Sequence, residues 1–296
     1  MKKTAPVRLL TAIGAAALAA TLASCSSSES TDLLGQIESG AVTLGAKYDQ
    51  PGLGLRSPDG AMSGLEVDIS TYVVNSIADD NGWEHPEITW RETPAAQRET
   101  FIQNGEVAMI AATYSINQAR LETVNFGGPF LVTHQALMVR EDDDRIQDMD
   151  DLNNDLILCS TAGSVPSQRA KEAIPGLQLQ EYDTPSSCIE ALDQGSVDAI
   201  TTDATILYGY AQYYPGDFRI VEMIKDGEQF TDEYYGIGLA KGDDEGTEAI
   251  NTALQKMYDD GTFDRLLEAN FGENPEVIEY GTPATSPVSS KHHHPI

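Results

Sequence analysis

Cysteine and histidine, the residue types best suited to chemistry, are scarce in this chain of 296 residues, with three cysteines and five histidines. As nucleophiles, bases or metal ligands they need particular neighbours. No cysteine–histidine grouping has zinc spacing, no triad-like order of serine, histidine and aspartate occurs, and no His-Glu helix motif is present. The run 292–294 (His-His-His) could hold a metal only loosely, because it lies in a polar tail that we expect to be disordered. We therefore expect no catalytic residue, no metal site and no cofactor.

The first 25 residues have the three parts of a signal peptide. Three cations lie within the first eight residues, residues 9–20 form an uncharged apolar run, and Leu-Ala-Ser-Cys occupies positions 22–25. The apolar run is shorter than the roughly 20 residues that span a bilayer, so we expect export rather than a transmembrane anchor. The last four residues resemble the lipobox of bacterial lipoproteins. This implies cleavage before Cys25, acyl chains such as palmitate on its sulfur, and attachment to the outer face of the membrane. The alternative is a secreted protein with an incidental cysteine.

The chain is strongly acidic, with 18 lysines and arginines against 47 aspartates and glutamates. Three of the cations and none of the acids precede Cys25, so the mature chain has 15 cations against 47 acids and a formal charge of −32. Such a surface repels nucleic acids and anionic headgroups, which excludes both as partners. We expect most of these acids, including the run 141–144 (Glu-Asp-Asp-Asp), to be solvated.

Cys159 and Cys188 are the two cysteines besides Cys25. Two thiols of an exported protein usually pair. A disulfide between them would contribute roughly 3 kcal/mol according to the chain-entropy account. The alternative is two separate buried thiols.

Short β-rich runs alternate with helix-length segments through the body of the chain, which predicts an α/β architecture. Leu65, Ile69 and Val73, for example, have helical spacing. The alternation restarts after residues 135–139, and two rounds of it indicate two α/β lobes rather than one barrel. We expect strands at 42–47, 87–91, 107–112, 156–159, 177–182 and 197–202, and helices at 64–79, 95–103, 164–173, 186–194, from the last strand to about 213, and at 245–270.

Several segments between residues 42 and 272 together resemble one family, the polar amino-acid solute-binding proteins that serve ABC importers. Within it, the chain looks closest to the lipid-anchored glutamate-binding proteins of Gram-positive bacteria. The ordered set carries the resemblance rather than any single motif. The segments are 49–54 (Asp-Gln-Pro-Gly-Leu-Gly), 64–68 (Gly-Leu-Glu-Val-Asp), 111–115 (Ala-Ala-Thr-Tyr-Ser) with Arg120, 124–126 (Val-Asn-Phe), 198–203 (Asp-Ala-Ile-Thr-Thr-Asp), 235–239 (Tyr-Gly-Ile-Gly-Leu) and 260–263 (Asp-Gly-Thr-Phe).

The resemblance implies a type II periplasmic-binding-protein fold, in which two lobes are joined by two crossovers and clamp one amino acid. The crossovers would lie near residues 130–134 and 231–235, and both Cys159 and Cys188 would then lie in lobe 2. The implied divisions are a flexible tether at 26–40, a discontinuous lobe 1 at 41–130 plus 236–280, lobe 2 at 135–230, and a disordered tail at 281–296.

The resemblance also implies how an α-carboxylate would be bound. Arg120 would supply a two-pronged guanidinium. Ser115 would donate its hydroxyl, and backbone N–H groups around Thr113 would complete the shell. The alternative for Arg120 is a surface cation. From lobe 2, the segment before a predicted helix would offer its amides, and its members are Thr161, Gly163 and Ser164.

Asp203 matches the ammonium ligand of the family, although an ordinary helix N-cap would suit the same position. Lys47 and Arg98 correspond to cations that bind acidic side chains, Arg91 lies on the neighbouring strand, and Thr202 adds a hydroxyl. The alternative for the three cations is solvated surface. In so acidic a body, an anionic ligand needs cations gathered locally, so glutamate is the first expectation, aspartate the second and glutamine the third.

The expected function is capture of glutamate by hinge closure and its delivery to an ABC permease, with the chain acting as a monomer. Two departures from other branches of the family weaken any transfer of their pockets. The lobe 2 strand ends in Cys159 where some relatives carry a lysine, and residues 49–51 lack an aromatic that stacks on ligand. The alternatives are a sensor for a membrane kinase and an enzyme on the same scaffold.

Overall fold

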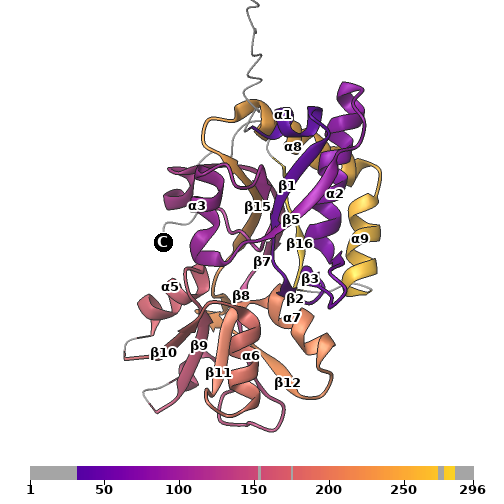
Figure 1. Cartoon of the computed structure of the whole chain (residues 1–296). Helices are drawn as coiled ribbons and strands as arrows, with labels where there is room; N and C mark the ends of the chain where they lie inside the picture. Colours follow the sequence, from indigo (N-terminus) through magenta and orange to yellow (C-terminus); the bar gives the residue numbers. More distant parts are fainter. Residues whose placement is uncertain (1–31, 153–154, 175, 273–276, 284–296) are drawn as a thin grey trace, which may run out of the picture.

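The computed structural model describes residues 32–152, 155–174, 176–272 and 277–283. Cys25, the signal peptide and the histidines of the tail lie outside these residues. Two lobes, each with its own sheet and covering helices, lie one above the other in Figure 1, and the chain crosses between them through paired strands. The architecture of two α/β lobes expected from the sequence is therefore present.

The sheet of lobe 1 has six strands in the order β16-β7-β15-β6-β1-β5. The three strands at one edge, β6, β1 and β5, are parallel, because β1 pairs with both of its neighbours in that sense. In contrast, β15 runs antiparallel to β6 and β7. The strands are β1 (Ala41–Ala46), β5 (Glu87–Glu92), β6 (Met109–Ile110), β7 (Val124–Thr133), β15 (Glu233–Ala240) and β16 (Glu279–Tyr280). A second, three-stranded sheet contains β2 (Asp49–Gln50), β3 (Gly54–Arg56) and β4 (Met62–Ser63).

Helices cover this sheet through apolar faces of helical period. Leu65, Ile69, Val73 and Ile77 form the buried face of the longest helix. The helices are α1 (Leu33–Glu38), α2 (Leu65–Asn81), α3 (Arg98–Gln103), α4 (Gln118–Leu121), α8 (Asp244–Asp259) and α9 (Thr262–Phe271), with the 3₁₀ turn η1 (Ala95–Gln97) before α3.

The five-stranded sheet of lobe 2 has the order β10-β9-β11-β8-β12. Here β9 is parallel to β10 and β11, and β8 is antiparallel to β11 and β12. The strands are β8 (Gln135–Arg140), β9 (Ile157–Thr161), β10 (Gln178–Tyr182), β11 (Ala199–Asp203) and β12 (Phe218–Glu222), with the hairpin β13 (Ile224–Lys225) and β14 (Glu228–Gln229). The helices are α5 (Val165–Ala173), α6 (Pro185–Asp193), α7 (Ala204–Tyr213) and the 3₁₀ turn η2 (Met149–Asp151).

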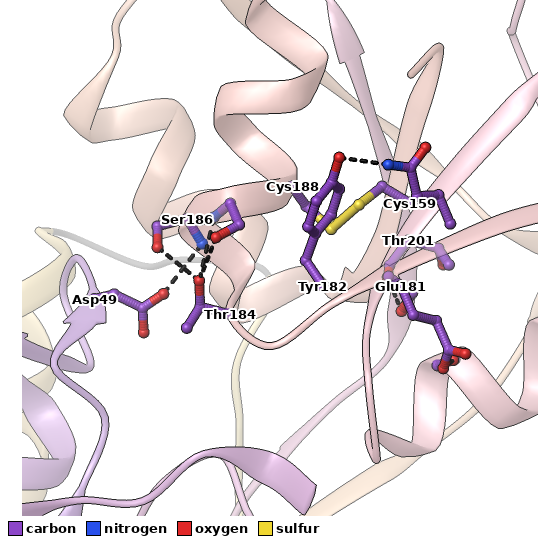
Figure 2. Close-up of a disulfide and its surroundings, with 12 residues drawn as sticks. Asp49, Cys159, Glu181, Tyr182, Thr184, Ser186, Cys188 and Thr201 are labelled. Carbon is purple, nitrogen blue, oxygen red and sulfur yellow. Dashed lines mark hydrogen bonds between the residues drawn. A yellow bond between two sulfur atoms is a disulfide. The ribbon is translucent and has the colours of Figure 1, made fainter. Parts of the chain in front are cut away.

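A disulfide joins Cys159 on β9 to Cys188 on α6, as predicted, with 5.8 Å between the two Cα atoms (Figure 2). Both residues are fully buried in lobe 2, so the bond fixes α6 against its sheet and leaves the crossovers free. The strand itself runs two residues further than expected, to Thr161.

Three expectations from the sequence need correction. The tether predicted for residues 26–40 is wrong for the last part, because α1 is a helix whose Leu33 and Ile37 are completely buried. The helix predicted at 245–270 is two helices, because Gly261 has a left-handed backbone (φ 70°) that ends the first and begins the second. Within the acidic run, Asp143 is buried rather than solvated, since it accepts hydrogen bonds from Arg140 and Arg145.

Candidate functional site

A small cavity with a volume of about 20 Å³ lies where the two lobes meet. Eight of the ten residues predicted to bind ligand line it, and they come from both lobes. Lobe 1 contributes Lys47, Arg98, Thr113 and Ser115, and lobe 2 contributes Thr161, Ser164, Thr202 and Asp203. Arg120 and Gly163 do not line the cavity.

Asp203 ends the buried strand β11 at the N-cap position of α7, but its side chain does not cap that helix. Its Oδ2 instead accepts a hydrogen bond of 2.5 Å from the Tyr235 hydroxyl. Its Oδ1 is buried and has no hydrogen-bond partner among the described residues. Burial, and then the nearby Glu233 carboxylate, raise the pKa of Asp203 to about 8. The carboxylate therefore lines the cavity with one oxygen available to a cationic group.

Arg98 opens α3 and is only 2 % exposed, so it is not a solvated surface cation. Its Nη1 donates to the carbonyl oxygens of Ala112 (2.8 Å) and Thr113 (3.0 Å). Its guanidinium carbon lies 4.3 Å from the centre of the Tyr114 ring. Burial and the neighbouring Arg120 lower the pKa of Arg98 to about 10, so the residue remains a cation at neutral pH.

Lys47 follows β1 directly and is 4 % exposed, again unlike a solvated cation. Burial and the charge of Arg98 lower the pKa of this lysine to about 7. A carboxylate that enters the cavity would favour the charged form of Lys47 and so be bound by it. Lys47 and Arg98 thus form a two-cation wall in lobe 1.

Glu66 is a buried acid beside these cations that the sequence reasoning did not assign to the site. Both of its carboxylate oxygens accept from the backbone N–H of Thr113, at 2.7 and 3.0 Å. The hydrogen bonds from Thr113 and the charges of Lys47 and Arg98 lower the pKa of Glu66, but burial raises it by more, so the pKa is about 7. The N–H of Thr113, expected to bind ligand, is therefore occupied by Glu66. This contact holds Thr113 in a left-handed conformation (φ 49°).

Arg120 is buried beside the cavity and connects the two lobes. Its Nη1 donates to the Ser115 carbonyl oxygen (2.6 Å), its Nε donates to Glu99 (3.1 Å), and its Nη2 donates to the Gly163 carbonyl oxygen of lobe 2 (3.3 Å). Gly163 has φ 75°, and a Cβ on it would lie 2.7 Å from the Cα of Ala96 in lobe 1, so only glycine fits there. The ligand-binding role predicted for Arg120 and Gly163 stays a prediction.

The lobe 2 wall contains the start of α5. Ser164 is its N-cap and accepts from the Ser167 N–H, so the first turn of α5 presents its positive end near the cavity. Thr161 is the last residue of β9, and Thr202 is the penultimate residue of β11. Both side chains are buried. Together they give lobe 2 hydroxyl groups around Asp203.

Gln50 is a polar residue that lines the cavity and was not predicted. Arg91 is a cation that does not line it. The Gln50 amide nitrogen donates to the Thr113 hydroxyl (3.3 Å), while its Oε1 is buried without a partner in the described part of the chain. Arg91 is half exposed, pairs with Glu106 and lies 4.4 Å from the Phe101 ring centre. No sequence signal separates Gln50 from surface amides, because its neighbours in the sequence are polar or turn-forming.

The arrangement has the chemistry of a clamp for a zwitterion with an added negative charge. Cations line one lobe, a carboxylate with an available oxygen lines the other, and hydroxyl groups fill the space between them. Within the described residues, no group of three or more His, Cys, Asp or Glu side chains is placed to hold a metal ion. No helix in those same ranges has both the length and the apolar character needed to cross a bilayer.

Residues 42–273 match the bacterial extracellular solute-binding proteins, family 3. The chain is 68% identical over 273 residues to a glutamate-binding protein of Corynebacterium glutamicum, a match that covers 92% of each chain. It is 66% identical over 278 residues to the glutamate-binding protein of Corynebacterium efficiens, covering 93% of this chain and 95% of that one.

Solved structures show the same fold. An ancestral arginine-binding protein bound to glutamine is 28% identical and superposes with a TM-score of 0.69 over 79% of this chain and 99% of that chain. A solute receptor for L-cysteine of Neisseria gonorrhoeae, 23% identical, superposes with a TM-score of 0.72 over 83% of this chain and 98% of that one. The expected two-lobed binding-protein fold is thereby confirmed.

Proposed function

Because this chain belongs to the bacterial extracellular solute-binding proteins of family 3, we propose that it binds glutamate between its lobes and delivers it to an ABC permease for uptake. The identity of 66–68% to two glutamate-binding proteins supports the choice of ligand. The lining of the cavity supports the choice of binding residues.

The observation that carries the proposal is the distribution of charge in the cavity. The Asp203 carboxylate, with its available Oδ1, pairs with the α-ammonium group. Lys47 and Arg98 face the side-chain carboxylate from lobe 1. In the proposed complex, Arg120, which lies beside the cavity rather than lining it, and the amides at the start of α5 bind the α-carboxylate. Each charge of glutamate then meets an opposite charge, whereas the neutral amide of glutamine leaves the two cations without an anion. The three charged residues that line the cavity, Lys47, Arg98 and Asp203, all serve as ligands of a zwitterion in this proposal, so the chain acts as a binding protein and not as an enzyme.

Binding drives closure because ligand groups are shared between the lobes. The ammonium group is held by lobe 2 and the side-chain carboxylate by lobe 1, so only the closed form makes both contacts. Glutamate therefore shifts the population toward the closed form by the difference in its affinity for the two forms. The closed form docks on the permease and releases its cargo.

The membrane attachment that we propose depends on Cys25, which lies outside the described residues. A lipid on this cysteine would keep the clamp near its permease and raise its local concentration without a fixed contact. The acidic body, with its formal charge far below zero, would then move over an anionic membrane without adhering to it. We propose that the chain acts there as a monomer.

Isothermal titration calorimetry on protein lacking residues 1–25 tests the ligand, with L-glutamate, L-aspartate and L-glutamine titrated separately. We expect glutamate to bind with a dissociation constant on the order of micromolar or tighter and the other two more weakly. Tighter binding of aspartate or glutamine would change the assigned ligand. Absence of binding by all three would refute the proposal.

Three arginine variants test the assignment of the site. We expect Arg120→Ala to abolish binding of every amino acid and Arg98→Ala to reduce the preference for glutamate over glutamine. Arg91→Ala is the matched control, because Arg91 lies on the strand next to β1 but is half exposed and paired with Glu106. Unchanged binding in both test variants would mean that the site lies elsewhere.

A further inference from the structure

Tyr235 connects the strand that leaves the hinge to the acid of the opposite lobe. It lies on β15 in the sheet of lobe 1, whereas Asp203 ends β11 in lobe 2. The hydroxyl of Tyr235 donates to Asp203 Oδ2 over 2.5 Å, and both residues are buried. This hydrogen bond therefore crosses from one lobe to the other beside the cavity.

The bond leaves the Asp203 carboxylate half satisfied. A buried ionised carboxylate needs several donors, and an oxygen without one is energetically costly. Oδ2 has its donor in Tyr235, while Oδ1 has none among the residues that the structure describes. The side chain makes no capping bond to α7, so the hydroxyl of Tyr235 is the contact that fixes which oxygen remains available.

We propose that Tyr235 is a positioning residue for amino-acid binding: its hydroxyl favours the ionised form of Asp203 and leaves Oδ1 directed at the ligand ammonium group. This inference rests on the proposed function. The ring of Tyr235 also packs, with its centre 6.4 Å from that of Phe130, so a purely structural role is the competing explanation.

The other charges around Asp203 oppose or balance one another. Glu233, two residues before Tyr235 on β15, disfavours a second negative charge nearby. Arg169 on α5 pairs with Glu233 and, together with Arg98 on α3, favours the ionised form of Asp203. Other charged or titratable groups near the cavity include Lys47, Glu66, Asp49 and the pair of Arg120 with Glu99, and His134 pairs with Glu222 next to the start of β8.

A pH dependence follows from this balance. Burial raises the pKa of Asp203 to about 8, and the bond from Tyr235 acts in the opposite direction by favouring the carboxylate. Without the hydroxyl, the pKa of Asp203 rises further. Since the ammonium group of the ligand pairs with the carboxylate, the contribution of Asp203 to affinity increases with pH, whereas that of Lys47 decreases as its ammonium group loses its proton near pH 7. Lys47 is the same in both proteins, so the difference between the wild type and the variant reports on Asp203.

The test compares glutamate affinity of the wild type and Tyr235→Phe by calorimetry from pH 6 to pH 8.5. We expect the variant to bind roughly tenfold more weakly at pH 7, as for loss of a hydrogen bond to a charged group. The difference should be nearly the same at pH 6, because both pKa values lie well above this pH, and smaller at pH 8.5. Asp203→Asn is expected to bind weakly at every pH and to lose the part of the pH dependence that comes from Asp203, while the part that comes from Lys47 and Glu66 remains.

Tyr258→Phe is the matched control. Its hydroxyl donates to the backbone carbonyl of Phe130, away from the cavity, so it removes a comparable hydroxyl without contact to Asp203. An equal loss of affinity at every pH in Tyr235→Phe, or no loss at all, would overturn the positioning role. Failure of the wild type to bind glutamate would instead refute the proposed function, so the two results are distinguishable.

Discussion

Asp49 of lobe 1 accepts a hydrogen bond from the first turn of a lobe 2 helix, and this contact makes a testable contribution to closure. Its Oδ2 lies 3.1 Å from the backbone nitrogen of Ser186, at the start of α6 (Figure 2). Its backbone carbonyl oxygen accepts from the Tyr210 hydroxyl at 2.5 Å. A carboxylate at a helix N-terminus is stabilised by both the amide and the helix dipole.

The size of the effect follows from what opening does to each partner. In the open form, water binds both the Asp49 carboxylate and the Ser186 N–H. The hydrogen bond between them therefore stabilises the closed form by about 1.5 kcal/mol, at the lower end for a hydrogen bond to a charged group. If the protein is mainly open without ligand, the dissociation constant rises by the same factor as the closure constant falls. Asp49→Ala should then weaken binding about tenfold. Asp49→Asn keeps an acceptor and loses the charge–dipole part, so we expect roughly threefold.

Calorimetry measures how far each variant raises the dissociation constant of glutamate. Thermal unfolding of the ligand-free protein shows whether the substitution also destabilises the fold. We expect the unfolding temperature of the free protein to stay unchanged, because unfolding begins from a form in which the contact is already broken. Asp59→Ala is the control, since this exposed lobe 1 acid bonds only within its own turn. A similar loss of affinity in that control, or none in Asp49→Ala, would refute the role in closure.

Two further predictions concern stability. Replacing Cys159 and Cys188 by serine opens a loop with a sequence separation of 29, which should cost about 3 to 4 kcal/mol and lower the unfolding temperature by roughly 10 °C in a thermal scan. The Arg145 guanidinium lowers the pKa of the Asp143 carboxyl from its ordinary 3.8 to about 2. The interaction of Asp143 with Arg145 therefore stabilises the folded protein above pH 3.8, and this stabilisation is lost as the pH falls through 2. Asp143→Asn should lower stability by about 1 kcal/mol at pH 7, measured by urea unfolding, and should reduce the further loss on acidification.

The elements that could be predicted are those whose apolar residues follow a regular period. The helix at α2 and the strand at β5 were expected within two residues of their observed ends. The long strand β7 was missed as a strand, because all but one of its ten residues are buried and no alternation marks it. The helix α1 was mistaken for tether, because its six residues carry a single turn of apolar contact.

Some site residues could be predicted from their place in the family segments, whereas others are identified only by their contacts in the folded protein. Lys47 lies beside one of the recognisable segments and Asp203 within another, whereas Arg98 was assigned by its position in the family alone. All three line the cavity. Glu66 lies in such a segment too, but nothing in a sequence with 47 acids marks the one whose carboxylate closes on a backbone amide of another element. That contact depends on the packing of α2 against the loop after β6, which is fixed only by the tertiary structure.

The choice between a helix cap and a ligand for Asp203 illustrates what the structure adds. Both readings place an aspartate at the junction of β11 and α7, so sequence position cannot separate them. The side chain makes no capping bond and instead accepts from the Tyr235 hydroxyl, 32 residues away on the other lobe. The acid that we propose as the partner of the ammonium group is therefore contacted by a residue of the opposite lobe. Opening the lobes would disturb this acid and separate it from the cations of lobe 1, so recognition and closure depend on the same contacts.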